Sequence, residues 1–154
     1  SEVIYNINQL ITSSVSEGRF ATMFYGEFNP FTRKLCYCNA GHNYPLVFKH
    51  DGTMYELLSN GMPCGIMEDT SFDDATIKLE PDDVVIFYTD GITESMNSDE
   101  VLFGEKNLID VVSKNLKLDS NSLISCLCDE ITRFIGDSPQ FDDITIMAVK
   151  LPVV

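Results

Sequence analysis

The sequence predicts an α+β fold whose sheets are built from antiparallel hairpins rather than from alternating βαβ units. One helical pattern is followed by about six short strand patterns, then two helical patterns, then a last strand. Turn signals such as Asp51-Gly52, a favoured hairpin pair, separate the strand patterns. The chain has 154 residues, 44% of them hydrophobic, which is enough for one domain with a real core.

In the first half of the chain, Val3, Ile4, Ile7, Leu10 and Ile11 recur at helical spacing. They predict an amphipathic helix over residues 2–14. The segment that follows, residues 19–28, carries apolar side chains on both faces and predicts a buried strand. Further strands are expected at residues 34–40, 46–49, 54–58, 75–79 and 84–89.

Helical patterns return after residue 100. One lies around residues 108–112, and a longer one runs from about residue 120 until Gly136 and Pro139 stop it. Residues 144–151 predict the last strand. We expect the strand phenylalanines to lie in the core: Phe20, Phe24, Phe48 and Phe87.

The bulk properties exclude some partners. The formal charge is -14, from 10 basic and 24 acidic residues, and such a surface repels nucleic acid and anionic membranes. It suits cations or basic proteins, or it simply keeps the domain soluble. No apolar run approaches the ~20 residues of a membrane span, and no signal-like segment opens the chain. We therefore expect a cytoplasmic protein without membrane contact.

Five cysteines are present, an odd number, and four of them are spaced C-x-C rather than in the C-x-x-C pattern of zinc or redox sites. We expect free, buried thiols in a reducing compartment. The cysteines are Cys36, Cys38, Cys64, Cys126 and Cys128.

Two acidic segments stand at the ends of apolar, β-branched runs. Asp90 follows the run at 84–89, and Asp142 and Asp143 precede the run that starts at Ile144. Carboxylates on rigid strand ends can converge on one hard divalent cation. Taken singly, the Asp-Gly pair also fits a turn and the Asp-Asp pair also fits a solvated loop end.

The sequence around these aspartates resembles that of the metal-dependent serine/threonine phosphatases of the bacterial type 2C superfamily. The resemblance is to the branch of the sporulation stage II phosphatase and the sigma-factor regulators. Six motifs in order carry the resemblance, which spans about residues 2–150. They are FATMFYG at 20–26, NAGHNYPL at 39–46, GMPCGI at 61–66, YTDGITE at 88–94, FG at 103–104 and FDDIT at 141–145.

The resemblance implies a sandwich of two antiparallel sheets flanked by helices, with two Mn²⁺ or Mg²⁺ ions and a metal-bound water that attacks phosphoserine or phosphothreonine. It implies that Asp90 and Asp142 are metal ligands and places Asp143 in or just behind the ligand set. Hard carboxylate oxygens suit both ions, whereas thiolates do not. The resemblance does not name a catalytic side chain.

His42 and Glu94 remain open between two interpretations. His42 could help to bind phosphate, or His42 and Asn43 could bond backbone groups across a bulged strand. Glu94 could lie behind the metal ligands, or it could serve at a helix start or in a loop.

The chain departs from the family pattern at its start, where the family's Gly-Asp-x-Tyr-Asp motif is missing. We therefore expect residues 1–154 to be a single domain that forms the C-terminal portion of a phosphatase domain, weak in metal binding and inactive alone. Bare sheet edges would favour a homodimer.

By the same resemblance, the substrate would be a phosphorylated regulatory protein of a sigma-factor partner-switching pathway. The alternative is a non-catalytic phosphatase-like module that binds a regulatory protein. A calcium-binding module is disfavoured because no D-x-D-x-D-G spacing occurs.

Overall fold

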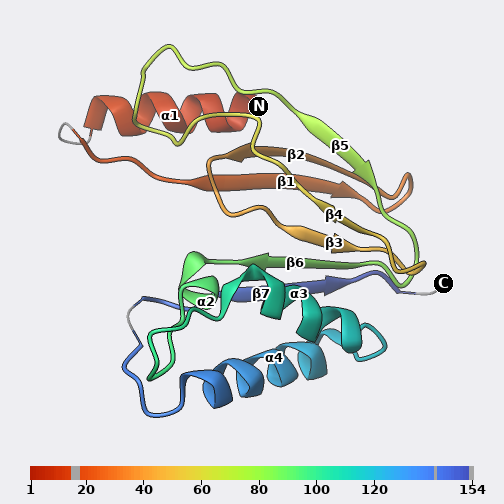
Figure 1. Ribbon diagram of the computed structural model, residues 1–154. Helices are drawn as coiled ribbons and strands as arrows, with labels where there is room; N and C mark the ends of the chain where they lie inside the picture. Colours follow the sequence, from red (N-terminus) through yellow and green to blue (C-terminus); the bar gives the residue numbers. More distant parts are fainter. Residues whose placement is uncertain (15–17, 141, 153–154) are drawn as a thin grey trace. The chain divides into compact units, whose positions relative to one another are not determined.

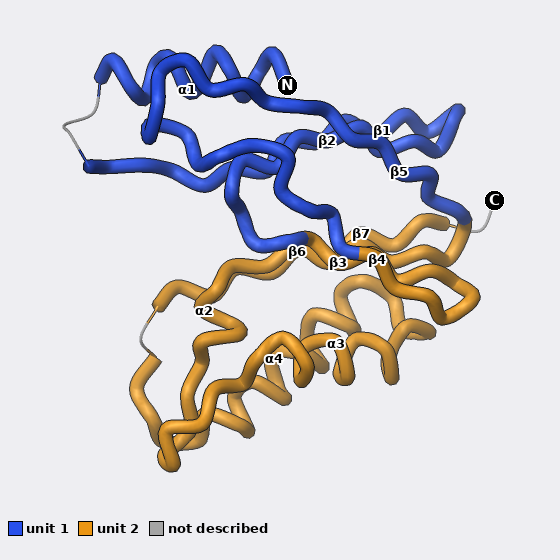
Figure 2. Tube along the Cα trace, turned by 45° about the horizontal axis from the view of Figure 1, so that its top comes forward, with its two compact units in different colours: residues 1–44, 56–80 blue, residues 45–55, 81–154 orange. Residues whose placement is uncertain are grey.

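The computed structural model describes residues 1–14, 18–140 and 142–152. The chain divides into two compact units (Figure 2). Unit 1 comprises residues 1–44 and 56–80, and unit 2 comprises residues 45–55 and 81–154. Two antiparallel sheets and several helices confirm the predicted α+β class.

Unit 1 holds a three-stranded sheet with one helix beside it (Figure 1). The helix buries Ile4 and Asn8, and it contacts the first strand. A small core of Ile4, Cys38, Ala40, Cys64 and Phe72 lies beneath it. The elements are α1 (Glu2–Ser14), β1 (Met23–Asn29), β2 (Lys34–Ala40) and β5 (Ala75–Lys78), with strand order β1-β2-β5.

The predicted buried strand at 19–28 is wrong in its start and in its burial. β1 begins at Met23, and Ala21 makes only an isolated bridge to Cys64. β1 is an edge strand that pairs on one side only, so its side chains are less covered than those of a central strand. Phe20 is 61% exposed and Phe28 is 43% exposed, which places neither in the core.

The other strand phenylalanines differ in burial. Phe48 is buried, as predicted. Phe24 and Phe87 are only partly buried, and the Phe24 ring stacks on Tyr37 with a centroid distance of 5.4 Å.

Unit 2 holds a four-stranded sheet in the order β4-β3-β6-β7, and its core is the larger of the two. The strands are β3 (Leu46–Phe48), β4 (Met54–Glu56), whose last residue is assigned to unit 1, β6 (Val84–Tyr88) and β7 (Ile146–Lys150). Helices α2 (Asp90–Thr93), α3 (Gly104–Lys114) and α4 (Ser120–Ile135) follow β6. In Figure 1, α3 and α4 lie on one face of β6 and β7.

The helices of unit 2 follow from their sequence patterns. α4 begins after Asp119, whose carboxylate accepts hydrogen bonds from the N–H groups of Asn121 and Ser122. It ends at Gly136, which has a φ of 59°. Its apolar stripe, Leu123, Leu127 and Ile131, is buried in the core with Leu108 and Val112 of α3.

All five cysteines are free thiols, as predicted, but only Cys38 and Cys64 are buried, whereas Cys36 and Cys128 are exposed. Burial raises the pKa of both the Cys38 and the Cys64 thiol. Within the described ranges, no helix is long and apolar enough to cross a bilayer.

Candidate metal centre

The two predicted acidic segments lie at the same end of the unit 2 sheet. β6 and β7 are antiparallel neighbours, and Tyr88 pairs with Ile146. Because the strands run in opposite directions, the residues that follow β6 lie beside those that precede β7. The segment starting at Asp90 is thereby placed next to the segment of Asp142 and Asp143.

Thr89 joins the two segments by hydrogen bonds. Its hydroxyl donates to the carbonyl oxygen of Asp143 at 2.9 Å and accepts from the N–H of Thr145 at 3.0 Å. Its own N–H donates to the carbonyl oxygen of Thr145 at 3.2 Å. Thr89 precedes α2 but makes no side-chain cap for it, because the hydroxyl serves this cross-link instead.

Gly91 shows how closely the segments approach. A Cβ atom at this position would lie 2.5 Å from the carbonyl oxygen of Asp143 and 3.4 Å from the carbonyl carbon of Asp142. No side chain fits there without movement, so glycine is required by contact rather than by an unusual φ. The α2 start and the Asp142-Asp143 backbone are therefore in van der Waals contact.

The three candidate ligands are all exposed. One oxygen of Asp142 accepts a hydrogen bond from the N–H of Asp143 at 2.7 Å. The carboxylates of Asp90 and Asp143 have no hydrogen-bond or ion-pair partner among the described residues. These two are therefore available to a ligand without the loss of an existing contact.

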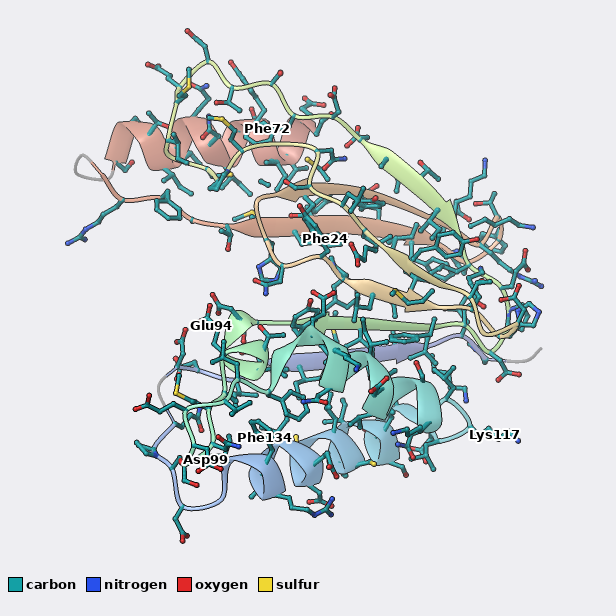
Figure 3. All side chains as sticks on the ribbon, viewed as in Figure 1. Phe24, Phe72, Glu94, Asp99, Lys117 and Phe134 are labelled. Atoms are coloured by element: carbon teal, nitrogen blue, oxygen red, sulfur yellow. The ribbon has the colours of Figure 1, made fainter. Side chains whose placement is uncertain are left out.

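A pocket of about 280 Å³ opens beside Asp142 and combines polar and apolar groups. Glu94 is exposed and ends α2 rather than starting a helix, and its N–H donates to the carbonyl oxygen of Asp90 at 2.8 Å. Figure 3 labels Glu94 at this end of unit 2. The pocket is lined by Gly91, Glu94, Ser95, Met96, Leu102 and Asp142.

The donor set fits a hard cation in part. Carboxylate oxygens are the ligands that Mg²⁺ and Mn²⁺ prefer, and Mg²⁺ is often held by one or two carboxylates with waters and phosphate completing its shell. Over residues 1–14, 18–140 and 142–152, however, no group of three or more His, Cys, Asp or Glu side chains could enclose a metal. The candidate carboxylates therefore stand at the surface and do not enclose a metal by themselves.

His42 lies in unit 1, and Asn39 fixes its main chain. Asn39 is buried. Its side-chain oxygen accepts a hydrogen bond from the N–H of His42 at 2.8 Å, and its side-chain nitrogen donates one to the carbonyl oxygen of His42 at 3.1 Å. The His42 ring lies 3.5 Å from the Thr22 hydroxyl. This local network gives His42 a structural position, and no observation tests a role in phosphate binding.

Sequence reasoning missed Thr89 and Gly91, which hold the segments together. The Asp-Gly pair suggested a turn, and nothing in one sequence shows that a glycine faces a backbone fifty residues away. Thr89 carries a hydroxyl group and directly precedes Asp90. This position is the one feature of the sequence that could have indicated its cross-linking role.

Two curated proteins are similar to this chain over most of its length. The chain is 32% identical over 130 residues to Protein IcfG of Synechocystis sp., covering 84% of this chain and 20% of that protein. It is 25% identical over 154 residues to Phosphoserine phosphatase RsbU of Bacillus subtilis, covering 99% of this chain and 45% of that protein. The chain thus spans one fifth to under half the length of these relatives.

Solved structures show the same fold. The SiaA-PP2C domain of Pseudomonas aeruginosa matches with a TM-score of 0.85 at 17% identity, over 97% of this chain and 59% of that one. The manganese-presoaked phosphatase domain of SpoIIE from Bacillus subtilis matches with a TM-score of 0.67 at 17% identity, over 99% and 66%. RsbX in complex with magnesium matches with a TM-score of 0.64 at 17% identity, over 96% and 62%.

The type 2C phosphatase fold expected from the sequence is therefore confirmed. The family model described as stage II sporulation protein E (SpoIIE) matches residues 1–152. The chain belongs to this family and is related to the sigma-factor regulators RsbU and RsbP.

Proposed function

We propose that this chain carries part of the active site of a Mn²⁺- or Mg²⁺-dependent phosphatase that hydrolyses phosphoserine or phosphothreonine on a regulatory protein. The observation that supports the proposal is the contact between Gly91 and Asp143, which holds the segments of Asp90 and Asp142 together. Two named relatives, RsbU and RsbP, are phosphoserine phosphatases.

The residues have separate tasks in this proposal. Asp90 and Asp142 hold the cation, and Asp143 supports or joins them. Thr89 keeps the two segments in register. When bound, the cation supplies charge neutralisation for the phosphate and lowers the pKa of water for attack.

Exposure favours a protein substrate. All three aspartates stand at the surface, where a phosphorylated side chain on a folded protein can reach them. The apolar side chains of Met96 and Leu102 line the adjoining pocket and would contact residues next to the phosphorylated one. The chain belongs to the SpoIIE family and is similar to RsbU, so we expect its substrate to belong to a sigma-factor partner-switching pathway.

A second function is a phosphatase-like module that binds a regulatory protein without catalysis. The observation that favours it is that no group of three or more His, Cys, Asp or Glu side chains among the described residues could hold a metal ion. A module of this kind would bind its partner equally well with and without a divalent cation.

Hydrolysis of a serine-phosphorylated protein, followed by phosphate release with Mn²⁺ and with EDTA, separates the two functions. It is measured on the full-length gene product and on residues 1–154. The proposal requires Mn²⁺-dependent turnover of the full-length protein and a loss of at least about 100-fold in Asp90→Asn, since a metal ligand is removed.

Asp110→Asn is the matched control, because Asp110 is an exposed carboxylate of the same unit on α3 and is not among the residues that line the pocket beside Asp142. Its turnover should equal that of wild type. Equal turnover in Asp90→Asn and wild type would remove Asp90 from the reaction, and turnover unaffected by EDTA would refute metal dependence.

A further inference from the structure

Unit 2 contains a second, larger cavity that the proposed function does not use. Its volume is about 760 Å³, and three lysines line it against one aspartate. We call it the lysine pocket. It is lined by His50, Gly52, Asp82, Ser113, Lys114, Leu116, Lys117 and Lys150.

One of the lysines has a structural task. The Lys150 ammonium donates to the carbonyl oxygens of Leu116 and Leu118 at 2.7 Å and 3.1 Å, just beyond the end of α3. It also lies 3.9 Å from a carboxylate oxygen of Asp82. Lys150 therefore holds the floor of the pocket in place and partly offsets the charge of Asp82.

The other two lysines have no such task. Lys114 and Lys117 are exposed, and neither has a hydrogen-bond or ion-pair partner in the part of the chain that the structure describes. The chain has 10 basic residues against 24 acidic ones, so three lysines gathered around one aspartate are unusual for this surface.

The helix dipole explains these lysines only in part. Lys114 stands in the last turn of α3, where a cation is favourable, and Lys150 occupies two carbonyl groups just beyond that turn. Lys117 lies beyond the helix, where the dipole has decayed, and its position facing the cavity needs another reason.

We propose that the lysine pocket binds an acidic, carboxylate-rich segment of a protein partner. Charge complementarity carries this choice, because positive charge on an otherwise acidic surface concentrates an acidic ligand at one place. Separate ammonium groups on flexible stems match several spaced carboxylates, whereas a single small anion is better held by a compact cradle of backbone N–H groups or by a guanidinium fork.

The lysine pocket is distinct from the candidate metal centre. Asp82 and Lys150 stand at one end of β6 and β7, and Asp90 and Asp142 at the other. Five-residue strands separate the ends by about 16 Å at about 3.3 Å per residue. Figure 3 shows Lys117 and Glu94 at opposite ends of unit 2. Binding at the lysine pocket therefore requires neither metal nor phosphate.

The test is fluorescence anisotropy of a fluorescein-labelled ten-residue polyglutamate peptide with residues 1–154 in EDTA. The charge-reversed pair Lys114→Glu/Lys117→Glu should weaken binding by about tenfold or more, and added salt should weaken the wild-type complex. The matched control is Lys34→Glu/Lys106→Glu, which changes the net charge equally at exposed lysines outside the pocket. It should bind within about twofold of wild type.

Three results would overturn the proposal. Equal weakening in both double variants would mean that the peptide senses only overall charge. Displacement by pyrophosphate at concentrations as low as those of unlabelled peptide would assign the pocket to small anions. Dimerisation that Lys114→Glu/Lys117→Glu abolishes in sedimentation would assign it to a second copy of this chain. Because the assay contains no metal, a failed phosphatase assay leaves its outcome unaffected.

Discussion

Gly91 has no room for a side chain because the carbonyl oxygen of Asp143 lies where its Cβ would be, at 2.5 Å. Residues 52 positions apart in the sequence are thus in backbone contact, and each is adjacent to a candidate metal ligand. This contact places the backbone at residues 90–91 beside that of residues 142–143.

Gly91→Ala should push the two segments apart. The added methyl group meets backbone rather than a flexible side chain, so we expect a loss of about 1–3 kcal/mol in the free energy of unfolding and weaker Mn²⁺ binding. Thermal unfolding and calorimetric titration measure the two effects. Gly26→Ala is the comparison, because its Cβ would crowd the ends of the Leu35 and Phe24 side chains at 3.1 Å and meet the backbone only at an ordinary 3.8 Å, at Cys36. Equal effects in both variants would contradict a special role for the Gly91 contact.

Thr89→Val should remove the cross-link and preserve the shape. It deletes two hydrogen bonds, to the carbonyl oxygen of Asp143 and from the N–H of Thr145. We expect a cost of about 1–2 kcal/mol in unfolding free energy, since two polar groups lose their partner. Thr89→Ser keeps the hydroxyl and should restore most of the stability and the metal affinity. Failure of serine to rescue would show that the methyl group, not the hydroxyl, matters.

Asp83 should contribute more stability than any surface ion pair of unit 2. Its carboxylate is fully buried, contacts the Lys49 ammonium and accepts from the N–H of His50 at 3.0 Å. Asp83→Asn removes the buried negative charge that faces the Lys49 ammonium, so we expect a loss of about 3 kcal/mol in chemical denaturation. Glu130→Gln, which breaks the exposed pair with Arg133, should leave the midpoint unchanged within error. A stable Asp83→Asn protein would refute this ranking.

The start of α4 should be sensitive to acid. Hydrogen bonds from the Ser122 N–H, the Ser122 hydroxyl and the Asn121 N–H lower the pKa of Asp119 below its ordinary value of 3.8. A carboxylate with a lowered folded-state pKa stabilises the protein above its unfolded pKa, and the stabilisation is lost as pH falls through the folded value. Asp119→Asn keeps a hydrogen-bond acceptor but has no charge to lose. Between pH 5 and 2, its free energy of unfolding should therefore fall less than that of wild type. Urea titrations at each pH measure this difference. An unchanged pH dependence would contradict this assignment.

Much of the fold could be predicted because local patterns decide it. The apolar spacing from Val3 to Ile11 gave the bounds of α1, and Gly136 marked the end of α4. The prediction that Phe20 lies in the core was wrong, because an apolar residue beside a strand pattern does not reveal that the strand is at the edge of its sheet. The four-residue helix α2 is too short to leave a periodic signal.

For the candidate site, the sequence named candidate ligands, which stay a prediction, but not the residues that hold their segments together. Asp90 and Asp142 could be named because carboxylates at strand ends suit a hard cation, and the family resemblance reinforced them. Thr89 and Gly91 depend on the register of Tyr88 with Ile146, which no single strand pattern contains. The predictions that the chain is the C-terminal portion of a phosphatase domain and that sheet edges form a homodimer stay untested.

The most direct test is a titration of ¹⁵N-labelled protein with trace Mn²⁺, followed by paramagnetic broadening of the backbone amide signals. Because Asp90 and Asp142 share one cation in this proposal, the Gly91 and Asp143 signals should broaden together at the lowest Mn²⁺ concentration, and Asp90→Asn should weaken both. Broadening of only one segment, or first broadening at an acidic surface position outside this pocket such as Asp110, would contradict a shared site.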